Sequence, residues 1–386
     1  MPRWLGTVLF VSTALIIWGG LNFYVYYRVA QCFDLGSRTR LVLKLAFVAF
    51  ALAYLVGRFV ENFVSARVAM PLMWTGAVWM GVFSITLSLL VLFDVWVWLP
   101  VWVLRRSAAI GPAIAESIAR WGLASVLLTA VVLSAWGART ALAGPRLTEL
   151  AFSSNTLPAS LEGFTLVAAS DIHVGDVVTK GYVHRLVEQI EALHPDLVVL
   201  IGDLSDEREG GDGSAFRELG SIRAKHGVLA VTGNHEFYSG AERQVRAIQA
   251  AGIPVLRQSH KLVDDALVVA GVDDPTFLRG KSHVAASIDQ ALQDRPRGLP
   301  VVLLAHQPLA VEHAAQSGVD LMLCGHTHGG QLPPFQFITG LAYSFLKGRY
   351  QVGKMLLYVN NGAGFWGPPI RVFAPPEIVR VRFTRG

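Results

Sequence analysis

Two histidines separated by one residue follow a short apolar run in the C-terminal part of the chain. The segment "DLMLCGHTHGG" (320–330) contains His326 and His328. On an extended segment alternate side chains share a face, so both imidazoles can point into one site. They lie about 6–7 Å apart along the chain, which lets each reach a different metal ion. The residues that permit tight turns and close backbone approach around them are Gly325, Gly329 and Gly330.

Other polar residues follow short apolar runs in the same way. Seven runs rich in branched residues and bounded by turn signals predict buried strands. These are 164–170, 196–201, 227–232, 266–272, 300–305, 320–324 and 354–359. Apolar residues at helical spacing predict helices over 183–193 and 240–252. The pattern predicts an α/β fold class with a layered arrangement of helices and strands.

Asp, Asn or His side chains follow five of these predicted strands. The candidates are Asp171, His173, Asp203, Asp206, Asn234, His235, His306, His326 and His328. Open α/β sheets usually form their sites at the carboxyl ends of strands. Taken singly, such an Asp is usually a turn or cap residue, and a lone His306 is compatible with a buried core histidine. Five coincident strand ends favour a site.

The residue types at this site indicate metal-dependent chemistry. His, Asp and Asn without cysteine suit Mn, Fe or Zn. Seven of the candidates are potential ligands, whereas one tetrahedral catalytic metal takes about three from the protein. Two divalent metal ions about 3.5–4 Å apart, sharing a carboxylate, fit better. A Walker-type Gly-Lys-Ser/Thr run and a Gly-x-Ser-x-Gly elbow are both missing from the sequence, which argues against nucleotide-driven and serine-hydrolase chemistry.

The motifs also resemble a known family. "DIH", "GDLSD", "GNHE", His306 and "GHTHGG" occur in the order of the calcineurin-like metallophosphoesterase superfamily, over residues 164–382. The tail "LYVNNGAGFWGPPIRVFAPPEI" resembles the bacterial membrane-associated branch of that superfamily. The resemblance implies a two-sheet β core flanked by helices and a phosphoesterase activity.

The same resemblance implies a role for each residue. One metal would be held by Asp171, His173, Asp203 and His328. The other would be held by Asp203, Asn234, His306 and His326, with Asp203 bridging. His235 would face the phosphate and protonate the leaving oxygen, and Asp206 would orient it. For Asp206 a solvated acidic loop is the alternative, and Glu236 is expected to support the loop. The implied reaction is hydrolysis of a phosphoester or pyrophosphate bond by a metal-bridging hydroxide.

The N-terminal part of the chain has a different composition. All 11 histidines lie after residue 150, whereas 7 of the 10 tryptophans lie before residue 106. We therefore predict a transmembrane helical region over 1–148 and a catalytic domain over 149–386. About 20 apolar residues cross a bilayer, and the candidate spans are 4–27, 41–60, 72–93 and 121–138. A cleaved signal peptide is the alternative for 4–27, but its length and the later spans favour an anchor.

Charge bears on partners and on orientation. Residues 1–150 carry a net charge of +7 and the remainder −2, so the basic residues flank the apolar spans. This distribution reflects membrane topology and predicts no nucleic-acid partner. With four spans, seven basic residues lie on the side opposite the catalytic domain and five on its own side. We therefore predict an integral protein of a plasma or inner membrane with an extracytoplasmic catalytic domain. Asp94 is expected to be a solvated residue at the end of a span.

The substrate is the least determined feature. The insert 332–353 follows the last histidine pair and contains five aromatic residues. One hypothesis is a membrane-facing segment or a lid that admits a lipid-linked phosphate or pyrophosphate; the alternative is a self-packed surface loop. Two other functions remain open. The domain can bind phosphate or a partner without catalysis, although complete ligand motifs argue against this. A transporter or channel would need charged residues or Gly and Pro breaks within its spans, and the spans are almost free of both, which favours an anchor.

Overall fold

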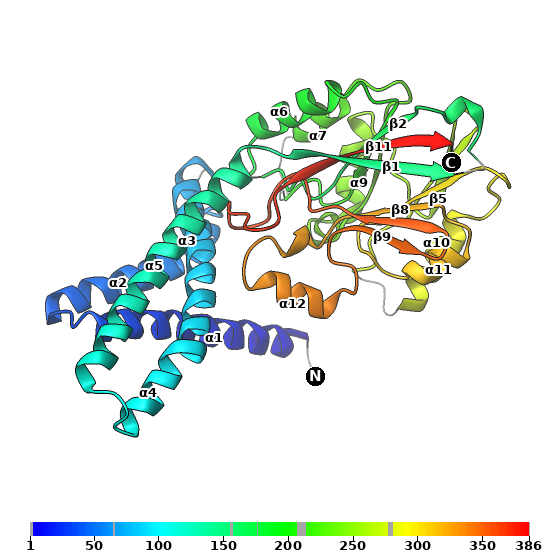
Figure 1. The fold of residues 1–386 in the computed structure, drawn as a ribbon. Helices are drawn as coiled ribbons and strands as arrows, with labels where there is room; N and C mark the ends of the chain where they lie inside the picture. The colour runs from blue at the N-terminus through cyan, green and yellow to red at the C-terminus, as the bar shows by residue number, and fades with distance from the viewer. Residues whose placement is uncertain are drawn as a thin grey trace. The chain divides into compact units, whose positions relative to one another are not determined.

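The structure is a computed structural model that describes residues 3–64, 66–154, 157–175, 177–206, 214–276 and 281–385. The chain forms two compact units (Figure 1). The helical unit consists of Met1–Ala138 together with two short later segments, Leu332–Pro334 and Gly367–Val372. The C-terminal unit consists of Arg139–Gln331, Phe335–Trp366 and Phe373–Gly386.

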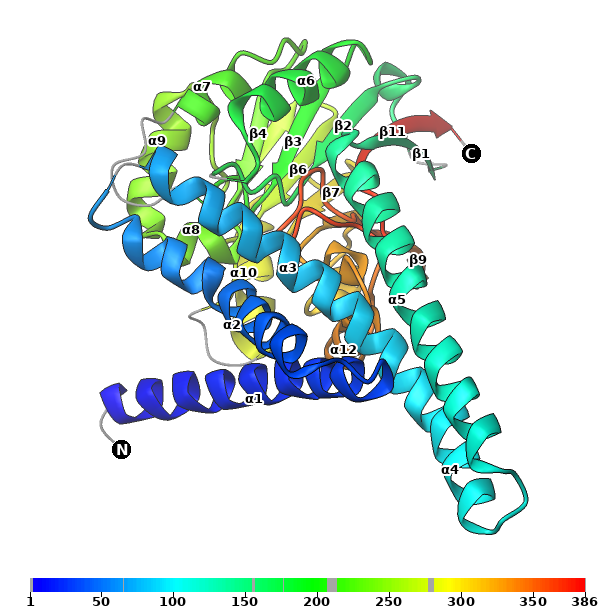
Figure 2. The ribbon, with the colours of Figure 1, turned by 90° about the vertical axis from the view of Figure 1, so that its left-hand side faces the viewer.

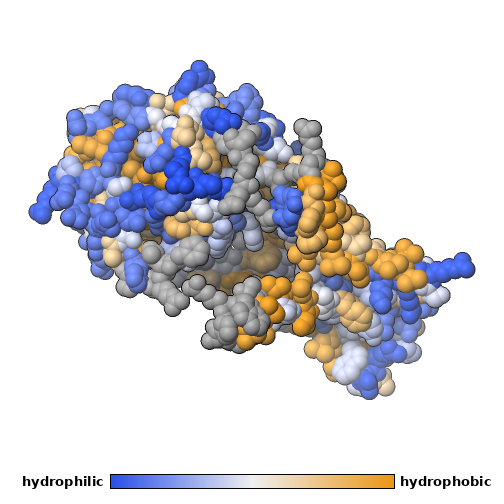
Figure 3. All heavy atoms as spheres, turned by 180° about the vertical axis from the view of Figure 1, so that it is seen from behind, coloured by the Kyte–Doolittle hydropathy of each residue, from blue (hydrophilic) through white to orange (hydrophobic). Residues whose placement is uncertain are grey.

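The helical unit contains the predicted membrane spans. Its elements are α1 (Arg3–Cys32), α2 (Ser37–Val60), α3 (Ala66–Phe93), the π-helix η1 (Asp94–Trp98), α4 (Leu99–Arg106) and α5 (Pro112–Leu142). Three helical stretches in the described part are long and apolar enough to cross a membrane: Ser37–Val60, Val68–Arg106 and Pro112–Leu142. Hydrophobic side chains gather over these helices, whereas the visible face of the C-terminal unit is mainly hydrophilic (Figure 3).

The first predicted span, 4–27, lies in α1, a helix of 30 residues. Several of its side chains lie outside the described part, so its role as a span stays a prediction. The third predicted span extends further than expected, because the helix continues through η1 and α4.

Asp94 was expected to be solvated, and this is wrong. Its carboxylate accepts hydrogen bonds from Arg28 Nε at 2.9 Å and from the Tyr24 hydroxyl. Only 19% of the Asp94 side chain is exposed. A carboxylate in apolar surroundings needs such a partner, because an unpaired buried charge is costly.

Two short segments from the C-terminal half of the chain pack within the helical unit. Leu332, Ile370 and Val372 form an apolar cluster with Ile85 and Ala130. Ser84 Oγ donates a hydrogen bond to the Pro333 carbonyl at 2.7 Å, and the Arg371 amide donates to the Gly137 carbonyl at 2.9 Å. The chain therefore returns twice to the membrane helices.

The C-terminal unit is built on two sheets. The first has the strand order β1 (Arg146–Ser154), β11 (Glu377–Arg385), β2 (Thr165–Ala169), β3 (Leu197–Ile201) and β4 (Val228–Val231). The second has the order β5 (Ser259–Val263), β6 (Leu267–Gly271), β7 (Val301–Leu304), β8 (Leu321–Cys324), β10 (Met355–Val359) and β9 (Gly348–Val352). The strands β2, β3 and β4 are parallel, and so are β6, β7, β8 and β10.

Helices cover the outer faces of both sheets. On the first sheet they are α6 (Lys180–Glu191), α7 (Ser214–Gly220) and α9 (Ala241–Ala250), seen beside β2–β4 in Figure 2. On the second sheet they are α10 (Lys281–Ala291) and α11 (Val311–Gln316). The remaining elements are η2 (Ala159–Leu161), α8 (Asn234–Tyr238), η3 (His328–Gly330) and α12 (Phe335–Ala342). An apolar core lies between the sheets. The predicted α/β fold with a two-sheet core flanked by helices is confirmed.

All seven predicted strands and both predicted helices are present. The strands β1, β5, β9 and β11 were not predicted. The strands β1, β5 and β9 lie at sheet edges and are partly exposed, with burial that alternates or is weak. The internal strand β11 is mostly buried, but Arg380 and Arg382 interrupt its apolar residues, so no continuous apolar run marks any of the four.

Candidate metal centre

The ends of five strands deliver the predicted site residues. Four of these residues lie two positions after the last residue of a strand: Asp171 after β2, Asp203 after β3, His306 after β7 and His326 after β8. Asn234 lies three positions after β4. The parallel register aligns the ends of β2, β3 and β4, and likewise those of β7 and β8. The candidates therefore come from the carboxyl ends of strands in both sheets. The sequence pattern of any one strand could not show this.

The backbone at the site adopts a conformation that is uncommon outside glycine. Positive φ angles occur at Asp171 (50°), His173 (53°), Asp203 (52°), His326 (71°) and His328 (50°). Such conformations cost free energy and cluster at functional sites. Five of the seven predicted ligands share this feature. Contacts with the surrounding fold must therefore offset the conformational free energy that these backbone angles cost.

Asp206 contacts two of the histidines. Its Oδ1 atom lies 3.0 Å from His173 Nδ1 and 2.6 Å from His235 Nδ1. Because a carboxylate only accepts hydrogen bonds, both imidazoles direct Nδ1–H toward Asp206. Their Nε2 atoms face the opposite way, where Asp203 Oδ2 lies 3.7 Å from His173 and 4.0 Å from His235.

His306 is oriented by the backbone. Its Nδ1 donates to the Ile201 carbonyl at 2.7 Å, at the end of β3 in the other sheet. Its Nε2 is buried, makes no hydrogen bond and lies 3.2 Å from Asp203 Oδ2. Nε2 is therefore the ring nitrogen that this imidazole directs at the carboxylate between the two groups of histidines.

His326 is held between two residues. Its Nδ1 lies 2.8 Å from Asn234 Oδ1, and its Nε2 lies 2.7 Å from the Tyr343 hydroxyl. Its backbone amide donates to both oxygens of Asp171, at 2.9 and 3.1 Å. Burial, reinforced by the neighbouring His306, lowers the pKa of His326 to about 4, which favours the neutral imidazole.

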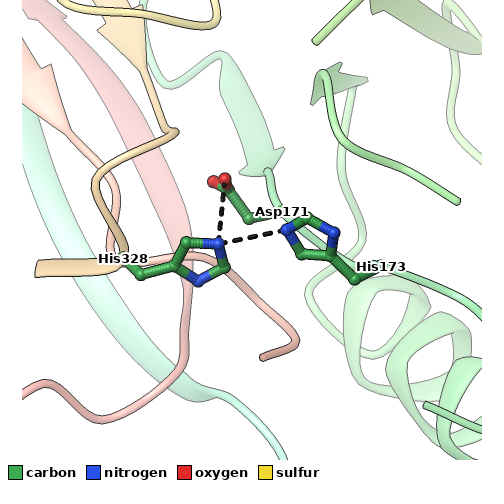
Figure 4. Close-up of side chains that lie close together, drawn as sticks. All are labelled: Asp171, His173 and His328. Carbon is green, nitrogen blue, oxygen red and sulfur yellow. Dashed lines mark hydrogen bonds and ion pairs between the residues drawn. The ribbon is translucent and has the colours of Figure 1, made fainter. Parts of the chain in front are cut away.

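Asp171, His173 and His328 form one face of the site, shown in Figure 4. His173 Nε2 and His328 Nε2 lie 3.1 Å apart, and Asp171 Oδ1 lies 3.5 Å from His328 Nε2. Although burial opposes protonation of His173, the Asp206 carboxylate raises its pKa to about 9. A proton on this imidazole supplies positive charge beside the carboxylates, and a bound cation would replace that proton.

These contacts fit bound cations. Because Nδ1 contacts Asp206 in His173 and the Ile201 carbonyl in His306, Nε2 is the ring nitrogen that each directs at Asp203, and it can bind a cation once it loses its proton. A metal-ligating histidine usually donates its other ring nitrogen to such a partner. Three groups have ligand atoms within 4.8 Å of one another: Asp171, His173 and His328; His173, Asp203 and His235; and Asp203, His306 and His326. The donor set therefore fits metal, and Asp203 belongs to two of the three groups.

Glu236 supports the loops that carry the site, and its carboxylate does not face the other site residues. Its fully buried carboxylate accepts hydrogen bonds from the backbone amides of Gly233 (2.6 Å), Leu204 (2.8 Å) and Asp203 (2.9 Å). Burial, followed by the nearby Asp203, raises the pKa of Glu236. The structure agrees with the expectation that this residue supports the loop.

Close backbone approach explains one glycine of the histidine motif. A Cβ atom on Gly325 would collide with the Asp171 carboxylate and would lie 2.7 Å from Ser170 Cβ. Asp171 is completely buried against this glycine. The site thus needs a residue without a side chain at position 325.

The structure brings all nine predicted site residues together, and it adds three that the sequence did not identify. Tyr343 contacts His326, Gln307 contacts Tyr343, and Asp274 contacts Gln307. Two of them carried a signal: Gln307 follows His306, and Asp274 lies after β6, a further strand end. Tyr343 belongs to the insert, and only tertiary structure brings it to the site.

The fold and the site define a metallophosphoesterase domain, and the comparisons agree. Residues 164–330 match the Calcineurin-like phosphoesterase family. An uncharacterized metallophosphoesterase of Aquifex aeolicus is 31% identical over 245 residues, which cover 61% of this chain and 90% of that protein. This chain belongs to the calcineurin-like metallophosphoesterase superfamily, whose members depend on metal.

Two other relatives are a transmembrane protein and a bacterial protein. A "Transmembrane protein with metallophosphoesterase domain" of Danio rerio is 34% identical over 72% of this chain and 66% of its own length. An uncharacterized metallophosphoesterase of Helicobacter pylori is 35% identical over 62% of this chain and 64% of its own length. The chain thus spans less than two thirds of these two relatives. Together with the three apolar helices, the comparison supports a membrane protein.

Proposed function

We propose that this protein is a membrane-anchored phosphoesterase that uses two divalent metal ions. One observation carries the proposal: the Nε2 atoms of His173 and His306, whose Nδ1 atoms contact Asp206 and the Ile201 carbonyl, converge on the buried carboxylate of Asp203. We assign Asp171, His173, Asp203 and His328 to one ion and Asp203, Asn234, His306 and His326 to the other. Mn, Fe and Zn all suit this donor set. When bound, the ions would lower the pKa of a coordinated water and neutralise charge on the phosphoryl oxygens.

The remaining residues serve the leaving group. His235 Nε2 faces the site while Asp206 accepts its Nδ1–H. In this orientation the imidazolium form of His235 can donate its Nε2 proton to the leaving oxygen. We assign His235 as the general acid and Asp206 as the residue that orients it.

A test of this function compares two esters. The full chain in lipid nanodiscs is stripped of metal, supplied with Mn, Fe or Zn, and assayed with bis-p-nitrophenyl phosphate and p-nitrophenyl phosphate beside Asp203→Ala. We expect metal-dependent turnover that Asp203→Ala abolishes, and the preferred ester separates diesterase from monoesterase. The exposed Asp289, which pairs with His313, provides the matched control Asp289→Asn. A folded, metal-loaded protein that hydrolyses neither ester nor a lipid phosphate would support the non-catalytic binding function instead.

A lipid-linked phosphate is our proposed substrate class. The helix α12 has no buried residue and exposes Phe335, Phe337 (77%), Ile338 and Leu341 (91%). It begins directly after Leu332–Pro334, a segment that packs within the helical unit. The later part of the insert is packed, because β9 pairs with β10. The exposed apolar side chains of α12, which follow this segment directly in the chain, support lipid binding.

This substrate class has its own test. The double substitution Phe337→Ser/Leu341→Ser removes the two most exposed large apolar side chains of α12, and Thr339→Ser is the control on the same helix. We expect slower hydrolysis of a polyprenyl pyrophosphate in nanodiscs and unchanged hydrolysis of a water-soluble ester. Equal effects on both substrates would argue against lipid recognition by α12.

The orientation proposal is an extracytoplasmic catalytic domain in a plasma or inner membrane. The Arg28–Asp94 ion pair joins the last turns of α1 to η1, so the basic segments after these two helices lie on one side. A periplasmic reporter fused after Gly386 should be active, whereas a cytoplasmic reporter active there would reverse the orientation.

A further inference from the structure

Four side chains form a hydrogen-bonded chain that leads away from the metal centre. His326 Nε2 lies 2.7 Å from the Tyr343 hydroxyl. The Tyr343 hydroxyl donates to Gln307 Oε1 at 2.9 Å. The Gln307 amide group donates to both carboxylate oxygens of Asp274, at 3.1 and 2.9 Å. The chain therefore connects a predicted metal ligand to a carboxylate that is 1% exposed.

Asp274, at the far end of this chain of side chains, fixes the direction of each hydrogen bond within it. Asp274 only accepts, and it also accepts from the amide and hydroxyl of Thr276 at 2.9 and 2.5 Å. Gln307 must therefore turn its NH₂ group toward Asp274 and its carbonyl oxygen toward Tyr343. Tyr343 has a single proton, which it gives to Gln307, so its oxygen accepts from Nε2–H of His326.

This direction determines what His326 presents to the site. With a proton on Nε2, the neutral imidazole carries an unshared electron pair on Nδ1. That Nδ1 lies 2.8 Å from Asn234 Oδ1, which is also an acceptor. Two acceptors this close are unfavourable unless a positive charge lies beside them, so this is a place where a cation is stabilised.

We propose that Tyr343, held by Gln307 and Asp274, is a positioning residue that fixes Nδ1 of His326 toward the metal centre. The inference rests on the proposed metal-dependent function. Tyr343 directly follows α12, and its amide donates to the Thr339 carbonyl in that helix at 2.9 Å. The orientation of a metal ligand is thereby tied to the position of α12, the helix with the exposed apolar face.

The substitution Tyr343→Phe separates the hydrogen bond from packing. The rings of Tyr343 and His326 are 5.2 Å apart in an edge contact, which phenylalanine preserves. Tyr350→Phe is the matched control, since its hydroxyl accepts only from the amides of Leu346 and Lys347 among the contacts described for it. Both tyrosines lie in the same insert.

The experiment measures metal affinity on the full chain in nanodiscs, by competition with a chromophoric chelator for Zn²⁺ and by the absorption spectrum of bound Co²⁺. We expect Tyr343→Phe to weaken one of two bound ions by about 10–100-fold and to alter the Co²⁺ spectrum. Tyr350→Phe should leave both unchanged. Asp274→Asn should have a smaller effect, because its carbonyl oxygen can still accept from Gln307.

The outcomes separate this inference from the function on which it rests. Unchanged affinity and spectrum in Tyr343→Phe, with wild-type protein binding two ions and hydrolysing its ester, would overturn the positioning role alone. Wild-type protein that binds no ion would overturn both. Should Tyr343→Phe not fold, Gln307→Leu interrupts the same chain one residue further, and the same loss of one ion is expected.

Discussion

The Asp206 carboxylate lies 2.6 Å from Nδ1 of His235 and leaves Nε2 of that histidine facing the site. If His235 is the general acid, His235→Ala should lower kcat by about 10²–10⁴-fold for esters with alkyl leaving groups. The loss should be smaller for p-nitrophenolate, a leaving group that needs little protonation. The two esters are compared in steady-state assays.

The metal content of His235→Ala provides the control. His235 also lies in a group with His173 and Asp203 that can hold an ion. Two bound ions in the variant, counted by mass spectrometry, would agree with an acid that is not a ligand. Loss of an ion would instead assign His235 as a ligand.

Asp206→Asn should have two effects, because Asp206 also contacts His173. The amide offers one accepting oxygen in place of a charged carboxylate shared by two imidazoles. We expect a lower kcat and weaker metal binding together, each by at least about 10-fold. Titration of metal against activity measures both. A fall in kcat with wild-type metal affinity would show that His173 does not depend on Asp206.

Asp203 and Asp171 should differ in the number of ions lost. Asp203 belongs to two ligand groups and Asp171 to one. We expect Asp203→Asn to lose both ions and Asp171→Asn to retain one, as counted after dialysis. Equal retention of one ion in both variants would contradict a bridging role for Asp203.

Gly325→Ala should disturb the site through a single methyl group. The new Cβ would collide with Asp171 and crowd Ser170, so Asp171 must move. We expect metal affinity and kcat/KM to fall by more than about 10-fold, in line with the effect of small displacements in active sites.

Gly181→Ala in α6 is the control for that substitution. Only Thr179 Oγ1, at 3.9 Å, lies near its added Cβ. Alanine within a helix should stabilise the protein by about 0.5–1 kcal/mol and leave activity unchanged. Wild-type metal binding in Gly325→Ala would show that the loop relaxes to accommodate the methyl group.

Glu236→Gln should lower the stability of the protein more directly than it lowers the rate of hydrolysis. The carboxylate accepts from three backbone amides, and the NH₂ group of glutamine cannot accept. Each buried amide left without a partner costs about 1–3 kcal/mol. Thermal unfolding should show a lower midpoint, whereas Glu242→Gln on the exposed face of α9 should not. An unchanged midpoint would mean that water replaces the lost acceptor.

The sequence was sufficient where chemistry follows local pattern. Buried parallel strands are continuous apolar runs, and each site residue follows such a run by two to five positions. Residue type and position were therefore enough to name Asp171, Asp203, Asn234 and the site histidines. The long apolar helices were equally clear from length and composition.

Partly exposed edge strands could not be recognised from the sequence. The strand β1 pairs in parallel with β11, more than 220 residues later, and its side chains alternate between buried and exposed. Its stability comes from that distant partner, so the local sequence gives little signal.

What only the tertiary structure decided is the orientation of each predicted metal ligand. Which nitrogen of His306 faces the site depends on the Ile201 carbonyl, and for His326 it depends on Tyr343. Only the tertiary structure shows that Asp206 contacts two histidines and that Leu332–Pro334 packs with the membrane helices. The sequence by itself determined which residues are available and where strands present them. Hydrogen-bond direction depends on atoms brought together across the chain, and that information exists only once the chain has folded.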